Sequence, residues 1–132
     1  MANLYPYLFS TNAREQAAFY AEALNGEIRS IQTFEEAPGT DDALHDKVMH
    51  LVLQAAGQTF FMADDVASDK VKGTNLDLTL EFEQEEDARM AFNGLSQGGS
   101  ILMPFEKMFW GAMFGRVEDR YGVRWQISTV QS

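Results

Sequence analysis

The feature that most constrains this fold is an order of predicted elements that occurs twice along the chain. Alternating apolar residues predict strands, and apolar residues three and four positions apart predict helices. Each half reads as one strand, one helix and then three strands. The predicted elements are strands 4–9, 27–34, 48–55 and 58–62 with helix 13–24, then strands 76–82, 100–105, 112–118 and 123–129 with a second helix after the first of them.

Signals at the helix ends and in the last hairpins support this repeat. Asn25-Gly26 predicts a left-handed stop to the first helix, and Gly98-Gly99 ends the second. The final hairpins correspond as well, since residues 57–62 (GQTFFM) match residues 122–127 (GVRWQI). A unit this short buries little apolar surface alone, so two units are expected to pair around one core.

The repeat therefore predicts one α+β domain over 1–132, built from paired βαβββ modules at 1–64 and 76–132. The pair is expected to form a cupped mixed sheet with a helix outside each half and a cavity within. The polar stretch 63–75 reads as the connector, and 36–46 as a loop because it carries Pro, Gly and several acids. Asp64 and Asp65, at the start of the connector, are predicted to be solvated.

Composition narrows the function classes. The chain has no Cys, which excludes disulfides, thiol nucleophiles and thiolate metal sites. Its formal net charge of −10 argues against nucleic acid and anionic membrane surfaces as partners. The first residues, MANLYPYLF, lack the basic flank and long apolar run of a signal peptide. A cytoplasmic location is the simplest expectation.

Alternation places a set of polar residues on the inward side of the predicted cup, where they are costly unless paired or wet. So many together predict a solvated pocket. The set is Tyr5, Tyr7, His50, Gln54, Thr59, Asp77, Thr79, Glu81, Arg124, Gln126 and Ser128. Within it, Glu81 and Arg124 are equally consistent with a structural salt bridge across the cup. Trp125 alternates with Gln126 and is expected to pack on a helix.

The stretch 102–127 is dense in aromatic residues, Met and Gly, and is typical of a pocket wall ending in a hairpin. Trp110, with Phe109 and Phe114, could stack on a planar ligand, and neighbouring Met side chains would give an adaptable lining. For any one of these aromatics, core packing or a dimer contact is the simpler reading. His50 could be a general base or a hydrogen-bond donor to a ligand, but a lone histidine satisfied by a neighbour is the simpler reading.

Several segments together resemble a known family. These are YPYLFSTNAREQAAFYAEALNG, MHLVLQAAGQTFFMADD and, most specific, MPFEKMFWGAMFGRVEDRYGVRW from Met103 to Trp125. With the βαβββ repeat they resemble the PhnB-like branch of the glyoxalase/bleomycin resistance/dioxygenase (vicinal oxygen chelate) superfamily, over almost the whole chain. The branch commonly has Pro at the position of Arg120, which should alter only the turn. Some relatives carry a demethylubiquinone methyltransferase label, but no glycine-rich strand-to-helix loop for a methyl donor exists here.

Metal enzymes of the superfamily hold a divalent ion with four inward residues, usually His or Glu. The resemblance carries those positions to Tyr5, Phe61, Thr79 (or Asp77 if the register slips) and Gln126. Divalent transition metals prefer imidazole and carboxylate ligands, and Phe61 supplies none. No metal and no other cofactor is therefore expected.

The resulting hypothesis is a homodimeric protein that binds a small molecule in the cup without the family metal. Its expected ligand-binding residues are Tyr5, Tyr7, His50, Gln54, Thr79, Trp110 and Gln126. The competing hypothesis is a lyase, isomerase or dioxygenase whose rearranged metal site uses His50 with Asp77 or Glu81. A third reading treats the cup as a filled core.

Overall fold

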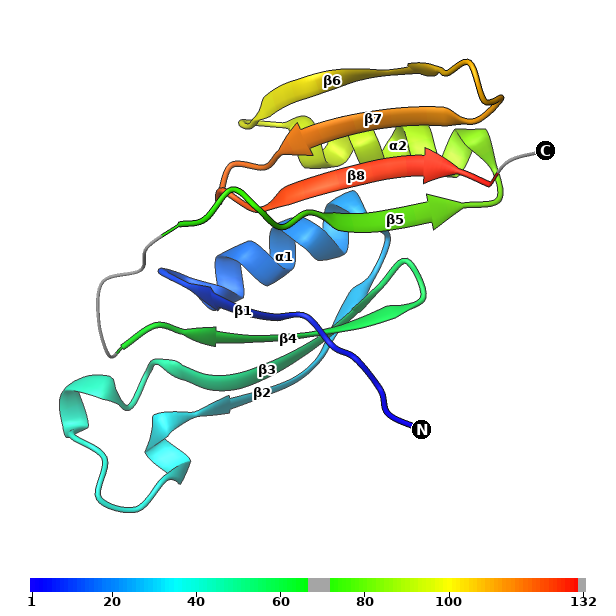
Figure 1. Ribbon diagram of the computed structural model, residues 1–132. Helices are drawn as coiled ribbons and strands as arrows, with labels where there is room; N and C mark the ends of the chain where they lie inside the picture. Colours follow the sequence, from blue (N-terminus) through cyan, green and yellow to red (C-terminus); the bar gives the residue numbers. More distant parts are fainter. Residues whose placement is uncertain (67–71, 131–132) are drawn as a thin grey trace. The chain divides into compact units, whose positions relative to one another are not determined.

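The computed structural model describes residues 1–66 and 72–130 and divides into two compact units, Met1–Lys70 and Val71–Ser132. Both units have the predicted order of one strand, one helix and three strands (Figure 1). The first contains β1 (Tyr7–Ser10), α1 (Ala13–Ala23), β2 (Glu27–Thr33), β3 (Val48–Ala55) and β4 (Gln58–Asp64). The second contains β5 (Leu78–Phe82), α2 (Glu85–Ser96), β6 (Ser100–Lys107), β7 (Met113–Glu118) and β8 (Arg124–Thr129). The α+β class with a βαβββ repeat is confirmed.

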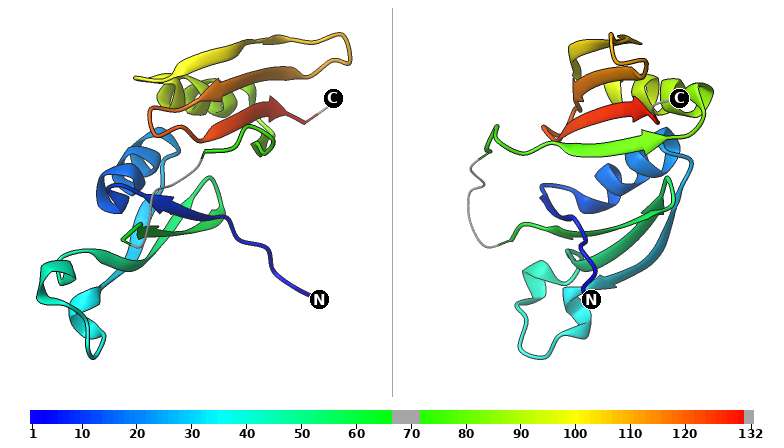
Figure 2. Two further views of the ribbon diagram at one scale, coloured as in Figure 1. Left: turned by 60° about the vertical axis from the view of Figure 1, so that its left-hand side comes forward. Right: turned by 45° about the vertical axis from the view of Figure 1, so that its right-hand side comes forward.

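Each unit has a four-stranded mixed sheet with the same topology. The strand orders are β1-β4-β3-β2 and β5-β8-β7-β6. The first strand of each unit pairs in parallel with the last, and the other pairs are antiparallel. Figure 2 shows, from two further directions, that each helix runs along one face of its own sheet. The face of each sheet that points away from its own helix is called the distal face below.

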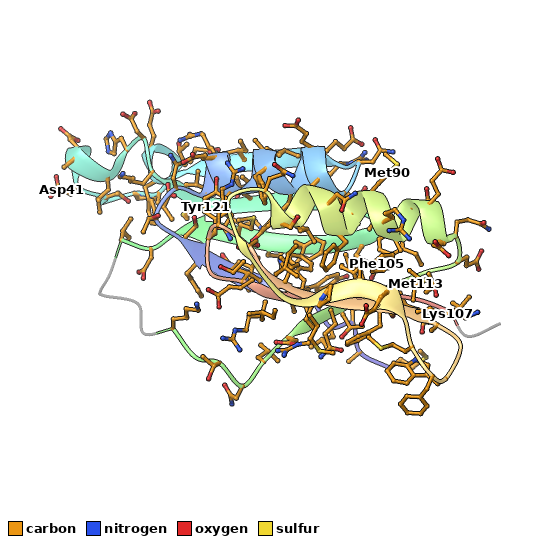
Figure 3. The ribbon with its side chains drawn as sticks, turned by 90° about the horizontal axis from the view of Figure 1, so that it is seen from above. Asp41, Met90, Phe105, Lys107, Met113 and Tyr121 are labelled. Atoms are coloured by element: carbon orange, nitrogen blue, oxygen red, sulfur yellow. The ribbon has the colours of Figure 1, made fainter. Side chains whose placement is uncertain are left out.

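Apolar side chains between each helix and its sheet form the cores. In the first unit, Tyr20 of α1 is fully buried with Leu51, Leu53 and Met62 of the sheet. In the second, Leu95 of α2 is fully buried together with Val117, Trp125 and Ile127. Trp125 thus lies on the helix side of β8, as its alternation with Gln126 predicts. Phe105 of β6 also points toward α2, and its ring centroid is 5.5 Å from that of Phe92 (Figure 3).

Both helices end at the predicted stops, and the stops are equivalent in the two units. Asn25 and Gly98 have positive φ values of 53° and 75°. The glycine after each has no room for a side chain: a Cβ on Gly26 would meet the backbone of Gln54 and Ala55, and one on Gly99 would meet the backbone of Glu118. The tight approach of the helix exit to the sheet is therefore repeated in both units.

Some predicted boundaries and surfaces are wrong. The first strand begins at Tyr7 rather than Leu4, which is 95% exposed, although the Pro6 carbonyl still accepts a hydrogen bond from the Phe61 N–H. Strand β4 continues to Asp64, and the rest of the predicted 63–75 connector lies partly outside the described residues. Two short 3₁₀ helices, Phe34–Glu36 and Asp42–Leu44, lie in and beside the predicted 36–46 loop.

Asp64 is not a solvated charge. Its two carboxylate oxygens accept hydrogen bonds of 2.7 Å from the backbone N–H groups of Ala13 and Val48. Ala13 is the first residue of α1, so the carboxylate lies at the positive end of that helix. One acid thereby connects the start of α1, the start of β3 and the end of β4.

Among the described residues, no helix is long and apolar enough to cross a membrane.

Candidate functional site

The distal face of the first sheet is a continuous surface of aromatic rings. Tyr7 and Phe61 face each other across the parallel β1–β4 pair, and their ring centroids are 6.0 Å apart. Phe61 also lies 4.7 Å from Tyr5 and 5.0 Å from His50, while Tyr7 lies 5.0 Å from Phe9. Tyr5 and Tyr7 are each 42% exposed and Phe9 is 58% exposed. These five residues, Tyr5, Tyr7, Phe9, His50 and Phe61, are called the aromatic surface below.

His50 lies in this surface and contacts Tyr7. The Tyr7 hydroxyl is 3.2 Å from His50 Nδ1, in a hydrogen bond whose donor depends on the histidine tautomer. The alternation in β3 places Leu51 and Leu53 in the core and His50 on the distal face, as predicted. Among the described residues, His50 Nε2 has no hydrogen-bond partner. The ring is thus oriented at one nitrogen and available at the other.

Gln54 lies at the other end of β3, opposite Thr59, and is exposed. It contributes to a hollow of about 480 Å³ between the end of α1 and the β3–β4 turn, which is lined by Asn25, Gly26, Glu27, Gln54, Ala55, Ala56 and Gly57. The only ionisable side chain of this lining is Glu27, and no residue of the aromatic surface belongs to it. The hollow therefore offers a ligand fewer side chains for stacking or proton transfer than the aromatic surface does.

The distal face of the second sheet carries a network of charged side chains. Arg116 Nε and Nη2 lie 2.9 and 2.8 Å from Asp77 Oδ2, and Gln126 Nε2 donates to the same oxygen at 3.0 Å. Glu118 Oε1 accepts from Arg124 Nε at 3.0 Å and lies 2.7 Å from Lys72 Nζ. These six residues, Lys72, Asp77, Arg116, Glu118, Arg124 and Gln126, are called the ionic network below.

Of the two alternatives left open for Glu81 and Arg124, the structural salt bridge is not among the ion pairs of the described residues, where Arg124 pairs with Glu118. Strand register places Glu81 opposite Ser128, whereas Arg124 lies opposite Glu118. Thr79 is exposed and lies opposite Gln126, as expected for two residues on the same face. The amide of Gln126 is only partly available to a ligand, because its Nε2 donates a hydrogen bond to Asp77.

Trp110 lies in the loop between β6 and β7. Its ring centroid is 4.8 Å from that of Phe109 and 6.0 Å from that of Phe114. Phe109 is 97% exposed and Trp110 is 41% exposed, while Phe114 is half-buried on the distal face of β7. Gly111, with φ of 100°, closes the loop. The structure thus brings the three predicted stacking residues together.

The donor set does not fit the family metal. Of the carried-over positions, Phe61 is a packed ring of the aromatic surface, and Gln126 directs its amide nitrogen at Asp77. Asp77 already receives three N–H groups on one oxygen. Within residues 1–66 and 72–130, no three His, Asp or Glu side chains come close enough to hold an ion.

Hydrogen bonds and charge keep the network ionised. The Arg116 hydrogen bond is the largest cause that holds the pKa of Asp77 below its usual value of 3.8; Gln126 and the charges of Arg116 and Arg124 act in the same direction, while burial opposes them. Bonds from Lys72 and Arg124 likewise lower the pKa of Glu118 below 4.5. Both carboxyl groups are therefore charged at neutral pH.

These shifts predict acid sensitivity. A carboxyl group whose pKa is lower in the folded than in the unfolded chain stabilises the fold above the unfolded pKa, and the contribution is lost as pH falls through the folded value. We expect the difference in unfolding free energy between wild type and Asp77→Asn to be constant above about pH 5 and to shrink toward pH 3. Urea titrations at a series of pH values measure it. A difference that is unchanged or grows toward pH 3 would show that the Asp77 carboxylate is not stabilised by its partners.

The sequence pattern placed Tyr5, Tyr7 and His50 on one face, but it gave Phe9 no role and missed Arg116, Glu118 and Lys72. Phe114, Arg116 and Glu118 alternate with buried Gly115 and Val117, so the pattern could have placed Arg116 on the distal face. Arg116 and Asp77 are 39 residues apart in sequence, so no local pattern indicates that the two side chains pair.

Known proteins and a family model match this chain along nearly its whole length. The family model described as 3-demethylubiquinone-9 3-methyltransferase matches residues 3–128. Protein YjdN of Escherichia coli (strain K12) is 29% identical over 140 residues, covering 97% of this chain and 95% of that protein. The crystal structure of protein PA1353 from Pseudomonas aeruginosa is 30% identical with a TM-score of 0.82, covering 100% of both chains. The PhnB protein from Bacillus cereus is 28% identical with a TM-score of 0.80, covering 98% of this chain and 100% of that one.

A more distant structure supports the fold alone. The glyoxylase/bleomycin resistance protein/dioxygenase domain from Frankia sp. EAN1pec is 11% identical, with a TM-score of 0.72 over 100% of this chain and 94% of that one. The βαβββ repeat and the match over residues 3–128 point the same way. The chain therefore belongs to the PhnB-like family, whose model carries the 3-demethylubiquinone-9 3-methyltransferase description, and it has the fold of glyoxalase/bleomycin resistance/dioxygenase proteins.

Proposed function

We propose that this protein binds small organic molecules without a metal ion, and that the distal face of each sheet is a binding surface. The observation that carries the proposal is the aromatic surface, where half-exposed rings surround His50. Half-exposed rings that pack against one another along a sheet offer a preformed platform for a planar ligand. Tyr5, Tyr7 and His50 are its proposed contacts, with Gln54 at the far end of β3.

In the second unit, Thr79, Trp110 and Gln126 are the proposed ligand contacts. Trp110 offers a further half-exposed ring, and Thr79 an exposed hydroxyl. Because one N–H of Gln126 Nε2 donates to Asp77, its amide oxygen and second N–H are what it would offer a ligand.

The methyltransferase description of the family does not enter the proposal. The turn between β1 and α1 is Thr11-Asn12, without glycine, and the Asn12 side chain accepts from the Glu15 N–H to cap the helix. This turn thus lacks the glycine-rich backbone with which doubly wound sheets hold nucleotide cofactors. The competing metal enzyme, with an ion held by His50 and Asp77 or Glu81, has less support because Asp77 is committed to Arg116.

A homodimer in the cytoplasm completes the proposal. The edge strand β6 is exposed along most of its length, with Ile101, Leu102 and Met103 between 37% and 55% exposed. Unpaired edges with apolar side chains favour pairing with another chain. The molar mass measured by light scattering tests the proposed homodimer separately from ligand binding.

A thermal-shift screen on chelator-treated protein tests ligand binding. Planar metabolites and antibiotics are screened against wild type, His50→Ala and the matched variant His45→Ala. A ligand at about 100 times its Kd stabilises the native state by about 2.7 kcal/mol, which raises Tm by several degrees. We expect hits that stabilise wild type and His45→Ala but not His50→Ala. Hits that stabilise wild type and both variants equally would place the ligand away from the aromatic surface.

A further inference from the structure

The ionic network leaves donors of two guanidinium groups without a partner. Arg116 directs both Nε and Nη2 at one oxygen, Asp77 Oδ2, so its Nη1 has no bond among the described residues. Arg124 uses Nε for Glu118, and its two terminal nitrogens have no bond there either. The side chains of Arg116 and Arg124 are 27% and 23% exposed. Both are therefore half-buried cations with N–H groups to offer.

The two arginines lie on neighbouring strands of one face. Arg116 of β7 is opposite Gln126, and Arg124 of β8 is opposite Glu118, so the two are diagonal neighbours across the antiparallel pair. Diagonal positions are about 7–8 Å apart, within reach of long side chains. Asp77 feels both charges, since both arginines act to keep it ionised. A single oxyanion between them could bond to both.

The charge balance of the network favours a singly charged anion. The chain has a formal net charge of −10 and only ten Lys and Arg residues, yet Lys72, Arg116 and Arg124 gather here against two acids, Asp77 and Glu118. Three positive and two negative charges leave one positive charge to be matched. Glu81 and Glu106 lie one step further along the same face, opposite Ser128 and Phe114, and are exposed. They would repel an anion with more than one charge.

We propose that the distal face of the second sheet binds a carboxylate group of a small molecule, held by the free N–H groups of Arg116 and Arg124. The inference deepens the proposed function and rests on it. Arginine matches a carboxylate with parallel N–H bonds, which a neutral amide cannot accept with the same strength. Asp77 acts as a positioning residue, because it fixes the plane of the Arg116 guanidinium without touching the ligand. Ser128 and Thr79 on the same face are short enough to leave the two arginines accessible.

An NMR titration of the wild-type full chain tests the inference without depending on a variant. The arginine Nε–H and histidine ring signals of ¹⁵N-labelled protein are followed with sodium benzoate, with neutral benzamide, and with NaCl at equal ionic strength. We expect saturable shifts of Arg116 and Arg124 with benzoate only. Equal shifts in NaCl, or shifts spread over all arginines, would mean general charge screening and would overturn the inference.

The histidine signals separate this inference from the proposed function. Shifts of His50 with both benzoate and benzamide, without shifts of Arg116, would keep ligand binding at the aromatic surface and reject the carboxylate site. Shifts of neither His50 nor the arginines would count against both. Shifts of Arg116 and Arg124 alone would support the carboxylate site and reject the aromatic surface as a contact for this probe.

Variants add a measure of affinity and of positioning. Arg116→Gln should weaken benzoate binding about tenfold or more, whereas Arg29→Gln, which removes an equal charge from an exposed ion pair with Glu27, should leave it unchanged. Arg116→Lys keeps the charge but loses the planar fork, so partial binding is expected. Asp77→Asn should broaden the Arg116 Nε–H signal, because the guanidinium loses the carboxylate that fixes its plane. Equal benzoate affinity in Arg116→Gln and Arg29→Gln would reject the site.

Discussion

Replacement of Asp119 by alanine should lower the free energy of unfolding by about 3–5 kcal/mol. Asp119 is 3% exposed at the end of β7, where its carboxylate accepts three hydrogen bonds. The donors are the backbone N–H groups of Tyr121 and Val123, at 2.8 and 3.1 Å, and the indole N–H of fully buried Trp125, at 2.8 Å. Alanine removes the acceptor of all three of these hydrogen bonds, and a buried donor that loses its acceptor costs about 1–3 kcal/mol.

Two further variants define the result for Asp119. Asp119→Asn retains one acceptor oxygen and should cost less than alanine, whereas Glu83→Ala, at an exposed acid of the same unit, should stay within about 0.5 kcal/mol of wild type. Urea unfolding followed by tryptophan fluorescence measures all three. A loss below about 1 kcal/mol for Asp119→Ala would show that the β7–β8 hairpin does not depend on this carboxylate.

Gly26→Ala should destabilise the protein by about 3 kcal/mol, mainly by collision with backbone. A Cβ at this position would lie 2.6 Å from Ala55 Cα and closer still to the Gln54 carbonyl oxygen. Backbone atoms of a paired strand cannot move aside as the end of a flexible side chain can. Either the exit of α1 or the end of β3 must shift, and the hollow that both line would change shape.

Gly57→Ala is the matched control, because its Cβ would meet nothing within 4 Å although its φ is +72°. It should cost only about 1–2 kcal/mol for the left-handed conformation. Gly99→Ala should behave like Gly26→Ala, since its Cβ would lie 3.0 Å from Asp119 Cα and nearer to the Glu118 carbonyl. Equal losses for the Gly26 and Gly57 variants in thermal unfolding would contradict the close-approach explanation.

Local pattern was enough to predict the repeat, the strand faces and the helix stops. Leu51 and Leu53 alternate with His50, so the face of β3 that carries His50 follows from period-two spacing. Asn25-Gly26 and Gly98-Gly99 each predict a left-handed residue that ends a helix, and both have it. These features depend on neighbours in sequence, which a single chain displays directly.

Contacts that depend on cross-strand register could not be predicted in this way. Arg124 pairs with Glu118 rather than Glu81 because the antiparallel β7–β8 register, not the common face, decides which charges meet. Asp64 has the sequence context of a solvated acid, yet it accepts from Ala13 and Val48, 51 and 16 residues away. The polarity of such residues is visible in the sequence, but their partners are fixed only by tertiary packing.

The most direct test of metal-free binding is calorimetric titration of a ligand from the screen, with and without EDTA, into wild type, Tyr7→Phe and His50→Ala. We predict the same Kd in EDTA as in its absence, a weaker Kd in Tyr7→Phe because His50 loses its hydrogen-bond partner, and no measurable binding in His50→Ala. Binding that disappears in EDTA and returns on addition of Mn²⁺ or Zn²⁺ would contradict the proposal and establish a metal site.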